Sequence, residues 1–128
     1  MKQELQNRLY DNFAFYIKGE SPFDYEVNRP WYGFECDDGW FELIYELSTK
    51  LKEAGFTGTV LQVKEKFGAL RFYANGITNV HDKIIEKYEE KSMTTCEFCG
   101  EQGQLRGGGW IKCLCDDCYR KDINNLST

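Results

Sequence analysis

Three segments of the chain place apolar side chains at the three- and four-residue spacing of an amphipathic helix. They cover residues 2–19, 37–55 and 78–92. In the first segment Gly19 is the predicted end of the helix. Its apolar positions are Leu5, Leu9, Phe13, Tyr16 and Ile17.

The middle segment has the clearest helical pattern of the chain. Asp37 or Asp38 can cap its N-terminus, and Gly55 can end it. The third helix has Thr78 or Asn79 as its predicted cap. The side chains predicted to face the core are Trp40, Leu43, Ile44, Leu47 and Leu51 in the middle helix, and Val80, Ile84 and Tyr88 in the third.

Between these two helices the pattern changes to the alternation of β-strands. Leu61 and Val63 are predicted to share the buried face of a first strand. On the second strand the buried pair is either Leu70 with Phe72 or Ala69 with Tyr73. Gly68 lies in the short connection, which favours a β-hairpin. The chain is therefore expected to be an α+β protein, with helices packed on a small antiparallel sheet.

Residues 20–37 have no such periodicity and are rich in aromatic side chains, so they are predicted to be irregular. Charge is segregated along the chain: residues 20–46 contain eight acids against one base. Residues 47–75 contain five bases against two acids. Such segregation indicates either ordinary solvated faces or two recognition patches of opposite sign.

The whole chain has 128 residues, a formal net charge of −5, and 41% hydrophobic residues, which suits one compact domain or a core with an appendage. An acidic protein is not expected to be a general binder of phosphate backbones. The first residues lack the apolar core of a signal peptide, and no apolar run is long enough to span a membrane. A cytoplasmic protein with reduced cysteines is therefore expected, rather than an exported one with three disulfides.

Two cysteine pairs have the spacing of a zinc site: Cys96 and Cys99, then fifteen residues, then Cys115 and Cys118. Four thiolates leave no open position on the metal, so the predicted Zn²⁺ is structural rather than catalytic. Residues 93–128 are poor in large apolar side chains, so they need a bound structural metal to stabilise their fold. They are expected to form a zinc-ribbon or treble-clef-like subdomain, beside an α+β core domain at 1–92.

A fifth cysteine, Cys113, lies two residues before Cys115. On a strand this spacing separates the two Cβ atoms by roughly 6.5 Å, which is too far for a shared metal. Cys113 is thus predicted to be a small buried side chain. Two alternatives stay open: Cys113 replaces Cys115 as a ligand of the metal, or Cys113 is a reactive thiol. The sixth cysteine, Cys36, has no predicted role.

No set of residues indicates a catalytic site. His81 is the only histidine and is expected to be solvated on a helix. The acids around Glu35, Asp37, Asp38 and Glu42 could serve acid–base chemistry, but capping and solvation explain them as well. The three glycines at 107–109 lack the context of a phosphate loop and are predicted to be the flexible tip of the zinc hairpin.

Three blocks together resemble a family of small proteins encoded by bacteriophages and prophages: "GFECDDGWFELIYELSTKL", "VLQVKEKFGALRFY" and "TTCEFCGEQGQLRGGGWIKCLCDDC". The resemblance spans roughly residues 33–118. In that family the two cysteine pairs recur, a Thr-like residue is common at Cys113, and Gly is common at Asp37. The resemblance implies a context of phage infection but no established activity.

The sequence thus predicts a non-enzymatic, zinc-binding module in the cytoplasm of a bacterial host. Its expected role is to bind and inhibit or modulate a host protein of defence or regulation. The alternative is a nucleic-acid-binding zinc ribbon, and a weaker one is a hydrolase or small-molecule sequestering protein with an acidic pocket. The candidate contact residues are Trp31, Tyr32, Asp37, Asp38, Trp40 and Trp110 for a protein partner, with Lys64 and Arg71 for nucleic acid.

Overall fold

The computed structural model of the chain describes residues 1–16 and 33–126. Within them the fold is α+β, as predicted, with a three-stranded sheet, a separate two-stranded sheet and four α-helices. The elements in chain order are α1 (Gln3–Asn12), β1 (Phe34–Glu35), the 3₁₀ turn η1 (Asp38–Trp40), α2 (Phe41–Glu53), β2 (Thr59–Lys66), β3 (Ala69–Asn75), α3 (Asn79–Ser92), β4 (Gln104–Arg106), β5 (Lys112–Leu114) and α4 (Asp116–Leu126).

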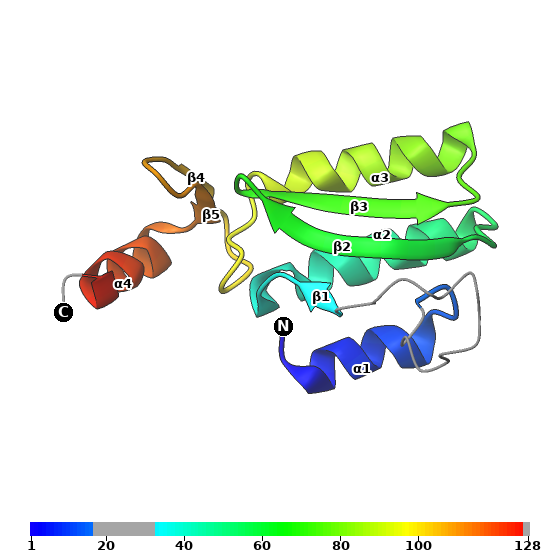
Figure 1. The fold of residues 1–128 in the computed structure, drawn as a ribbon, viewed down its shortest axis with the longest axis horizontal. Coiled ribbons are helices and arrows are strands. Elements are labelled where there is room, and N and C mark those ends of the chain that lie inside the picture. The colour runs from blue at the N-terminus through cyan, green and yellow to red at the C-terminus, as the bar shows by residue number, and fades with distance from the viewer. Residues whose placement is uncertain (17–32, 127–128) are drawn as a thin grey trace.

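The helices are arranged around the sheet. In Figure 1, α2 lies behind strands β2 and β3, α3 runs along the upper edge of the sheet, and α1 lies below it. The small hairpin β4–β5 and helix α4 extend from one end of this body. Helix α1 is shorter than predicted, because at Phe13 the backbone becomes extended and places Phe13, Phe15 and Tyr16 in the core. The predicted helix end at Gly19 lies outside the described residues.

The predicted β2–β3 hairpin is confirmed, with Phe67 and Gly68 in its connection. Strand β1 pairs in parallel with β2, so the sheet has the order β1-β2-β3 and is mixed rather than purely antiparallel. This strand is only two residues long. Its partner is distant in sequence, and so short a strand has no periodicity that would reveal it.

The buried face of the hairpin differs from the prediction at one position. A break in register between Val60 and Gln62 puts Val60, not Leu61, on the core side with Val63. On β3 the buried pair is Leu70 and Phe72, the first of the two options. A bulge adds one residue to a strand and so changes which residues share a face.

Helix α2 buries the predicted face and is followed by Gly55, whose φ of +76° suits glycine. The predicted side-chain cap is wrong, because neither Asp37 nor Asp38 caps the start of η1 and α2. The Asp38 carboxylate instead accepts the backbone N–H of Lys2 at 2.7 Å. The carboxylate that was predicted to cap the helix is therefore used in a tertiary hydrogen bond with Lys2, which directly precedes α1.

Helix α3 begins at the predicted cap, Thr78, but presents a different face. Val80 is 59% exposed, whereas His81, Ile85 and Tyr88 are buried. The prediction of a solvated His81 is therefore wrong. Its Nε2 donates to the carbonyl of Ala54 at 2.9 Å, and its Nδ1 accepts the backbone N–H of Thr78 at 3.1 Å. Both ring nitrogens are satisfied, so burial of this polar side chain is tolerated.

Side chains of α3 also cover the free edge of β3. Ser92 Oγ accepts the N–H of Leu70 at 2.8 Å, and Glu89 Oε2 accepts the N–H of Phe72 at 2.9 Å. An edge strand with open donors is a template for pairing with another chain. Here two helical side chains satisfy these donors, so the edge is covered. Within the described residues, no helix covers the face of β2 and β3 opposite α2 (Figure 1).

Candidate metal centre

Four cysteine sulfurs meet at the junction between the main body and the β4–β5 hairpin. The sulfurs of Cys96, Cys99, Cys115 and Cys118 all lie within 4.8 Å of one another, and those of Cys99 and Cys115 are 3.6 Å apart. Zn–S bonds of about 2.3 Å in a tetrahedron separate sulfurs by a little under 4 Å. The four cysteines singled out by their spacing can therefore hold a metal ion.

The first cysteine pair lies on a tight turn after α3. The N–H of Gly100 donates to the carbonyl of Cys96 at 2.9 Å, which closes the turn around the pair. Gly100 has a φ of +85°, and a Cβ there would approach the carbonyl of Gly39 to 3.1 Å. Glycine is thus favoured both by the left-handed backbone and by the close neighbour.

The second pair lies where β5 ends and α4 begins. Cys115 follows β5, and Cys118 is in the first turn of α4, as predicted. The N–H of Cys118 donates to the sulfur of Cys115 at 3.4 Å. Turn, hairpin, second turn and helix together form the expected treble-clef-like arrangement.

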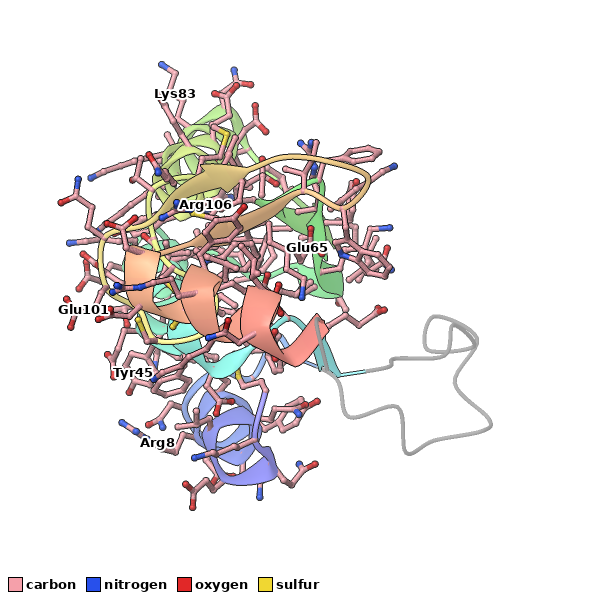
Figure 2. The ribbon with its side chains drawn as sticks, turned by 90° about the vertical axis from the view of Figure 1, so that its left-hand side faces the viewer. Arg8, Tyr45, Glu65, Lys83, Glu101 and Arg106 are labelled. Atoms are coloured by element: carbon pink, nitrogen blue, oxygen red, sulfur yellow. The ribbon has the colours of Figure 1, made fainter. Side chains whose placement is uncertain are left out.

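Arg106 connects the hairpin to α4. Its Nε donates to the carbonyl of Leu114 at 3.2 Å, and its Nη2 pairs with Asp116 at 2.6 Å. Its guanidinium also lies over the ring of Tyr119, 4.6 Å from the centroid. Figure 2 shows Arg106 between the hairpin and α4. The arginine fixes the first turn of α4, and with it the position of Cys118.

Cys113 lies outside the sulfur cluster and is fully buried with the hydrophobic core. Burial raises the pKa of its thiol to about 11. This confirms the prediction of a small buried side chain. Cys36 is also buried, and burial raises the pKa of its thiol as well. Neither thiol has the exposed, electropositive surroundings of a reactive cysteine.

The cluster is packed against the start of α2 through Gly39. A Cβ at Gly39 would lie 2.3 Å from the carbonyl oxygen of Cys96 and 2.5 Å from the carbonyl of Glu97. The N–H of Gly39 donates to the carbonyl of Glu97 at 2.7 Å, and Trp40 Nε1 donates to the carbonyl of Thr95 at 2.8 Å. Backbone and indole together bind the first cysteine turn to the core.

Glu97 is the buried acid of this junction. It is 4% exposed, and its Oε2 accepts the N–H of Asp37 at 3.0 Å. Burial raises the pKa of Glu97 to about 7. Neither Glu97 nor Gly39 was predicted from the sequence. An acid inside a cysteine pair and a glycine beside the predicted cap are the only local signals.

The thiols differ in how readily they ionise. Burial raises the pKa of Cys96, but backbone hydrogen bonds, of which that from Cys115 is the largest, lower it to about 7. Burial and its thiol neighbours raise the pKa of Cys118. A backbone hydrogen bond from Glu101 lowers the pKa of Cys99, but burial and the adjacent thiols outweigh it. One thiolate forms easily, and its charge opposes the others unless a cation is present.

The predicted contact residues are scattered. Trp40 is fully buried, which corrects its assignment as a contact residue, because its indole serves the junction. Asp37 is exposed, and Asp38 pairs with Lys2 at 3.9 Å. Trp31 and Tyr32 lie outside the described residues. Lys64 and Arg71 are half-buried and face each other across β2 and β3, far in sequence from Trp110, which is 77% exposed.

A cavity of about 490 Å³ lies between the β4–β5 loop and α4. Its lining is mostly apolar, with Trp110 and the glycines 107–109 on one side and Tyr119 and Ile123 on the other. Ile123 is 43% exposed. The glycine tip was predicted from the sequence, but the helix face opposite it was not.

None of the helices in the described part of the chain is long and apolar enough to cross a membrane. Comparison of the chain with known protein families, with curated proteins and with solved structures finds no match.

Proposed function

We propose that this protein is a zinc-stabilised, non-enzymatic binding module of bacteriophage type, which binds and modulates a protein of its bacterial host in the cytoplasm. The phage context rests on the resemblance of its sequence blocks. The single observation that carries the proposal is the apolar cavity beside the exposed Trp110, built on a closed four-cysteine cluster.

Zinc is the metal that suits this cluster best. Four thiolates at tetrahedral separation are typical of structural zinc sites. A divalent cation also offsets the mutual repulsion of thiolates whose pKa values are otherwise raised, as those of Cys99 and Cys118 are. With four sulfur ligands the ion has no position for a substrate or an activated water. Its role is to hold the β4–β5 hairpin and α4 in place.

The lone histidine supports a role without catalysis. A general base must reach a substrate with a free nitrogen. The ring of His81 is 4% exposed, and both its nitrogens are used by the backbone of Ala54 and Thr78. The acidic pocket of the weaker alternative is also less attractive, because Asp38 pairs with Lys2. Acid–base chemistry therefore has little support.

The cavity favours a protein partner. Aromatic side chains at the rim of an apolar pocket are common among residues that dominate binding energy at interfaces. Trp110 is 77% exposed, whereas Tyr119 lies under Arg106 at the cavity wall. A volume of about 490 Å³ accommodates one or two large side chains of a partner. An inserted apolar side chain would bury both the indole and Ile123.

The experiment places a photo-crosslinking amino acid at position 122, where Asp122 lines the α4 side of the cavity, and exposes the zinc-loaded protein to host lysate. One or a few discrete cross-linked host proteins are expected, and Trp110→Ala should abolish their capture while one zinc per chain remains bound. Val80→Ala is the matched control, because Val80 is 59% exposed on α3, away from the cavity. Equal capture by the Trp110→Ala protein would overturn the proposal.

A further inference from the structure

The face of the β2–β3 hairpin opposite the core, which no described helix covers, carries three cations. Residues directly opposite each other in the two strands share a face. On the face opposite the core the cross-strand pairs are Lys66 with the buried Ala69, the half-buried Lys64 with Arg71, and Gln62 with Tyr73. The inward pair between them, Val63 with Phe72, belongs to the core. Three cations and an aromatic ring that is 45% exposed thus lie on one side of the sheet.

The opposition of Lys64 and Arg71 works against folding. Like charges directly across a strand pair destabilise a sheet. Among the described residues, no carboxylate forms an ion pair within 4.0 Å of Lys64, Lys66 or Arg71. Glu35, which is in register with Lys64, accepts a hydrogen bond from Gln62 at 3.3 Å. Within the described ranges 1–16 and 33–126, these three cations thus lack an ion-pair partner and can attract an anion.

The carboxylate of Glu89 does not change this conclusion. The charge of Arg71 lowers the pKa of Glu89, but burial outweighs that effect and the pKa is raised. The same carboxylate accepts the N–H of Phe72 on the edge of β3. The Glu89 carboxylate thus serves as a hydrogen-bond acceptor at the edge of the sheet and forms no ion pair with Arg71.

The tip of the hairpin has a second feature that folding does not explain. Phe67 has a φ of +54° and a side chain that is 66% exposed. Together with Gly68, at a φ of +81°, it forms a two-residue turn with both residues in the left-handed region. Asn is strongly preferred at the first position of such a turn, and a bulky residue there is strained. The chain holds an aromatic ring in solvent at a conformational cost.

The ring of Phe67 lies next to the cations of this face. Lys66 Nζ lies over the ring of Phe67, 5.5 Å from its centroid. From Tyr73 to Phe67 the strand direction covers six residues, or roughly 20 Å. We define this surface, formed by Lys64, Lys66, Phe67, Arg71 and Tyr73, as the hairpin strip.

We propose that the hairpin strip binds single-stranded nucleic acid, with bases stacking on the two aromatic rings and phosphates on the three cations. Proteins that bind single strands combine aromatic stacking platforms with cations that follow the backbone. Two exposed rings beside one exposed and two half-buried cations suit base stacking better than the insertion of a protein side chain. The net charge of −5 does not oppose this, because most acids lie elsewhere in the sequence. Of the two acids near the strip, Glu35 accepts a hydrogen bond from Gln62, and Glu65 accepts the N–H of Gly68 at 2.8 Å from the opposite face of β2.

This site is separate from the cavity beside Trp110 and does not depend on the proposed protein partner. The strip is short and Glu35 lies at its margin, so it fits a short single strand rather than a long duplex. Binding should be tolerant of sequence, because every base has a face that can stack.

The test is fluorescence anisotropy of a short labelled oligodeoxythymidylate, titrated with the zinc-loaded protein at several salt concentrations. The logarithm of the binding constant should fall with the logarithm of salt with a slope of about −2, from roughly 0.7 for each of three cations. The double variant Lys64→Gln with Arg71→Gln should reduce this slope to about −0.7. Lys83→Gln is the matched control, since Lys83 extends into solvent from α3 (Figure 2).

The variant Phe67→Asn separates binding from folding. It replaces a strained aromatic residue with the one that the turn prefers, so the midpoint of thermal unfolding should rise. Affinity for the oligonucleotide should fall roughly 5-fold or more, as for loss of a stacking ring. Tyr73→Ala should weaken binding similarly. The proposal is overturned if the protein does not bind the oligonucleotide at low salt, or if Phe67→Asn and the double variant bind as tightly as the unchanged protein. If the protein binds an acidic protein through Lys64 and Arg71 but does not bind the oligonucleotide, the strip belongs to a different class of partner and the proposal is overturned.

Discussion

Replacing Gly39 with alanine tests whether the metal centre and the helical core are one structural unit. The added Cβ would lie 2.3 Å from the carbonyl oxygen of Cys96 and 2.5 Å from the carbonyl of Glu97. Carbon atoms need about 3.5 Å or more for favourable contact. Because the neighbours are backbone atoms, no side chain can rotate away. The cysteine turn must move by about 1 Å.

The movement has a calculable cost. Overpacking of a well-packed site costs typically 1–3 kcal/mol. The hydrogen bond from Gly39 N–H to Glu97, now 2.7 Å long, would stretch, and a lost hydrogen bond costs about 1 kcal/mol. We therefore expect Gly39→Ala to lower the free energy of unfolding by about 2–4 kcal/mol. The same displacement should weaken metal binding, because Cys96 lies in the moved turn.

The assay is urea denaturation of the zinc-loaded protein, followed by competition for zinc with a coloured chelator. Gly109→Ala is the control, because a Cβ there has no atom within 4 Å. The control should unfold within about 0.5 kcal/mol of the unchanged protein, as surface substitutions usually do. If Gly39→Ala is equally well tolerated, the junction is not tightly packed and the reasoning from it fails.

Two further predictions concern the thiols and the edge of the sheet. Cys115→Ala should lose zinc and unfold the β4–β5 hairpin with α4, as measured by metal content and thermal unfolding. Cys113→Ala should keep zinc and lower the free energy of unfolding by about 1 kcal/mol. If Cys113→Ala loses zinc and Cys115→Ala keeps it, Cys113 is the ligand instead of Cys115. Burial raises the pKa of Glu89, so its folded form holds a proton more tightly than the unfolded chain, and its contribution to stability is present at low pH and lost as pH rises through the folded pKa. Glu97, whose pKa burial raises to about 7, adds to the same decline. Glu89→Gln keeps an acceptor for the N–H of Phe72 and should therefore remove the part of the decline that Glu89 contributes, measured as the difference between the unfolding scans of the variant and the unchanged protein. Identical pH profiles would exclude Glu89 as a source.

The metal centre could be predicted from sequence because its signal is local. Two residues between paired cysteines set the reach of each turn, and this spacing holds whatever the rest of the chain does. Strand geometry likewise predicted that Cys113 is a small buried side chain, and Cys113 is buried in the core. The contact surfaces were harder to predict. Trp40 is apolar, aromatic and next to acids, as an interface residue can be, yet its indole N–H binds Thr95 inside the junction.

By itself the sequence determined the elements whose causes lie within a few residues: the buried stripe of α2, the β2–β3 hairpin, the start of α3 at Thr78, and the four cysteines that cluster where they could hold a metal ion. Tertiary structure alone decided the rest. The parallel pairing of β1, the inward turn of His81, and the contact of Gly39 with Cys96 join segments that are far apart in the chain. Periodicity and capping rules describe neighbours along the chain. Which hydrogen-bond donor or acceptor is satisfied, and by what, depends on the elements that packing brings beside it.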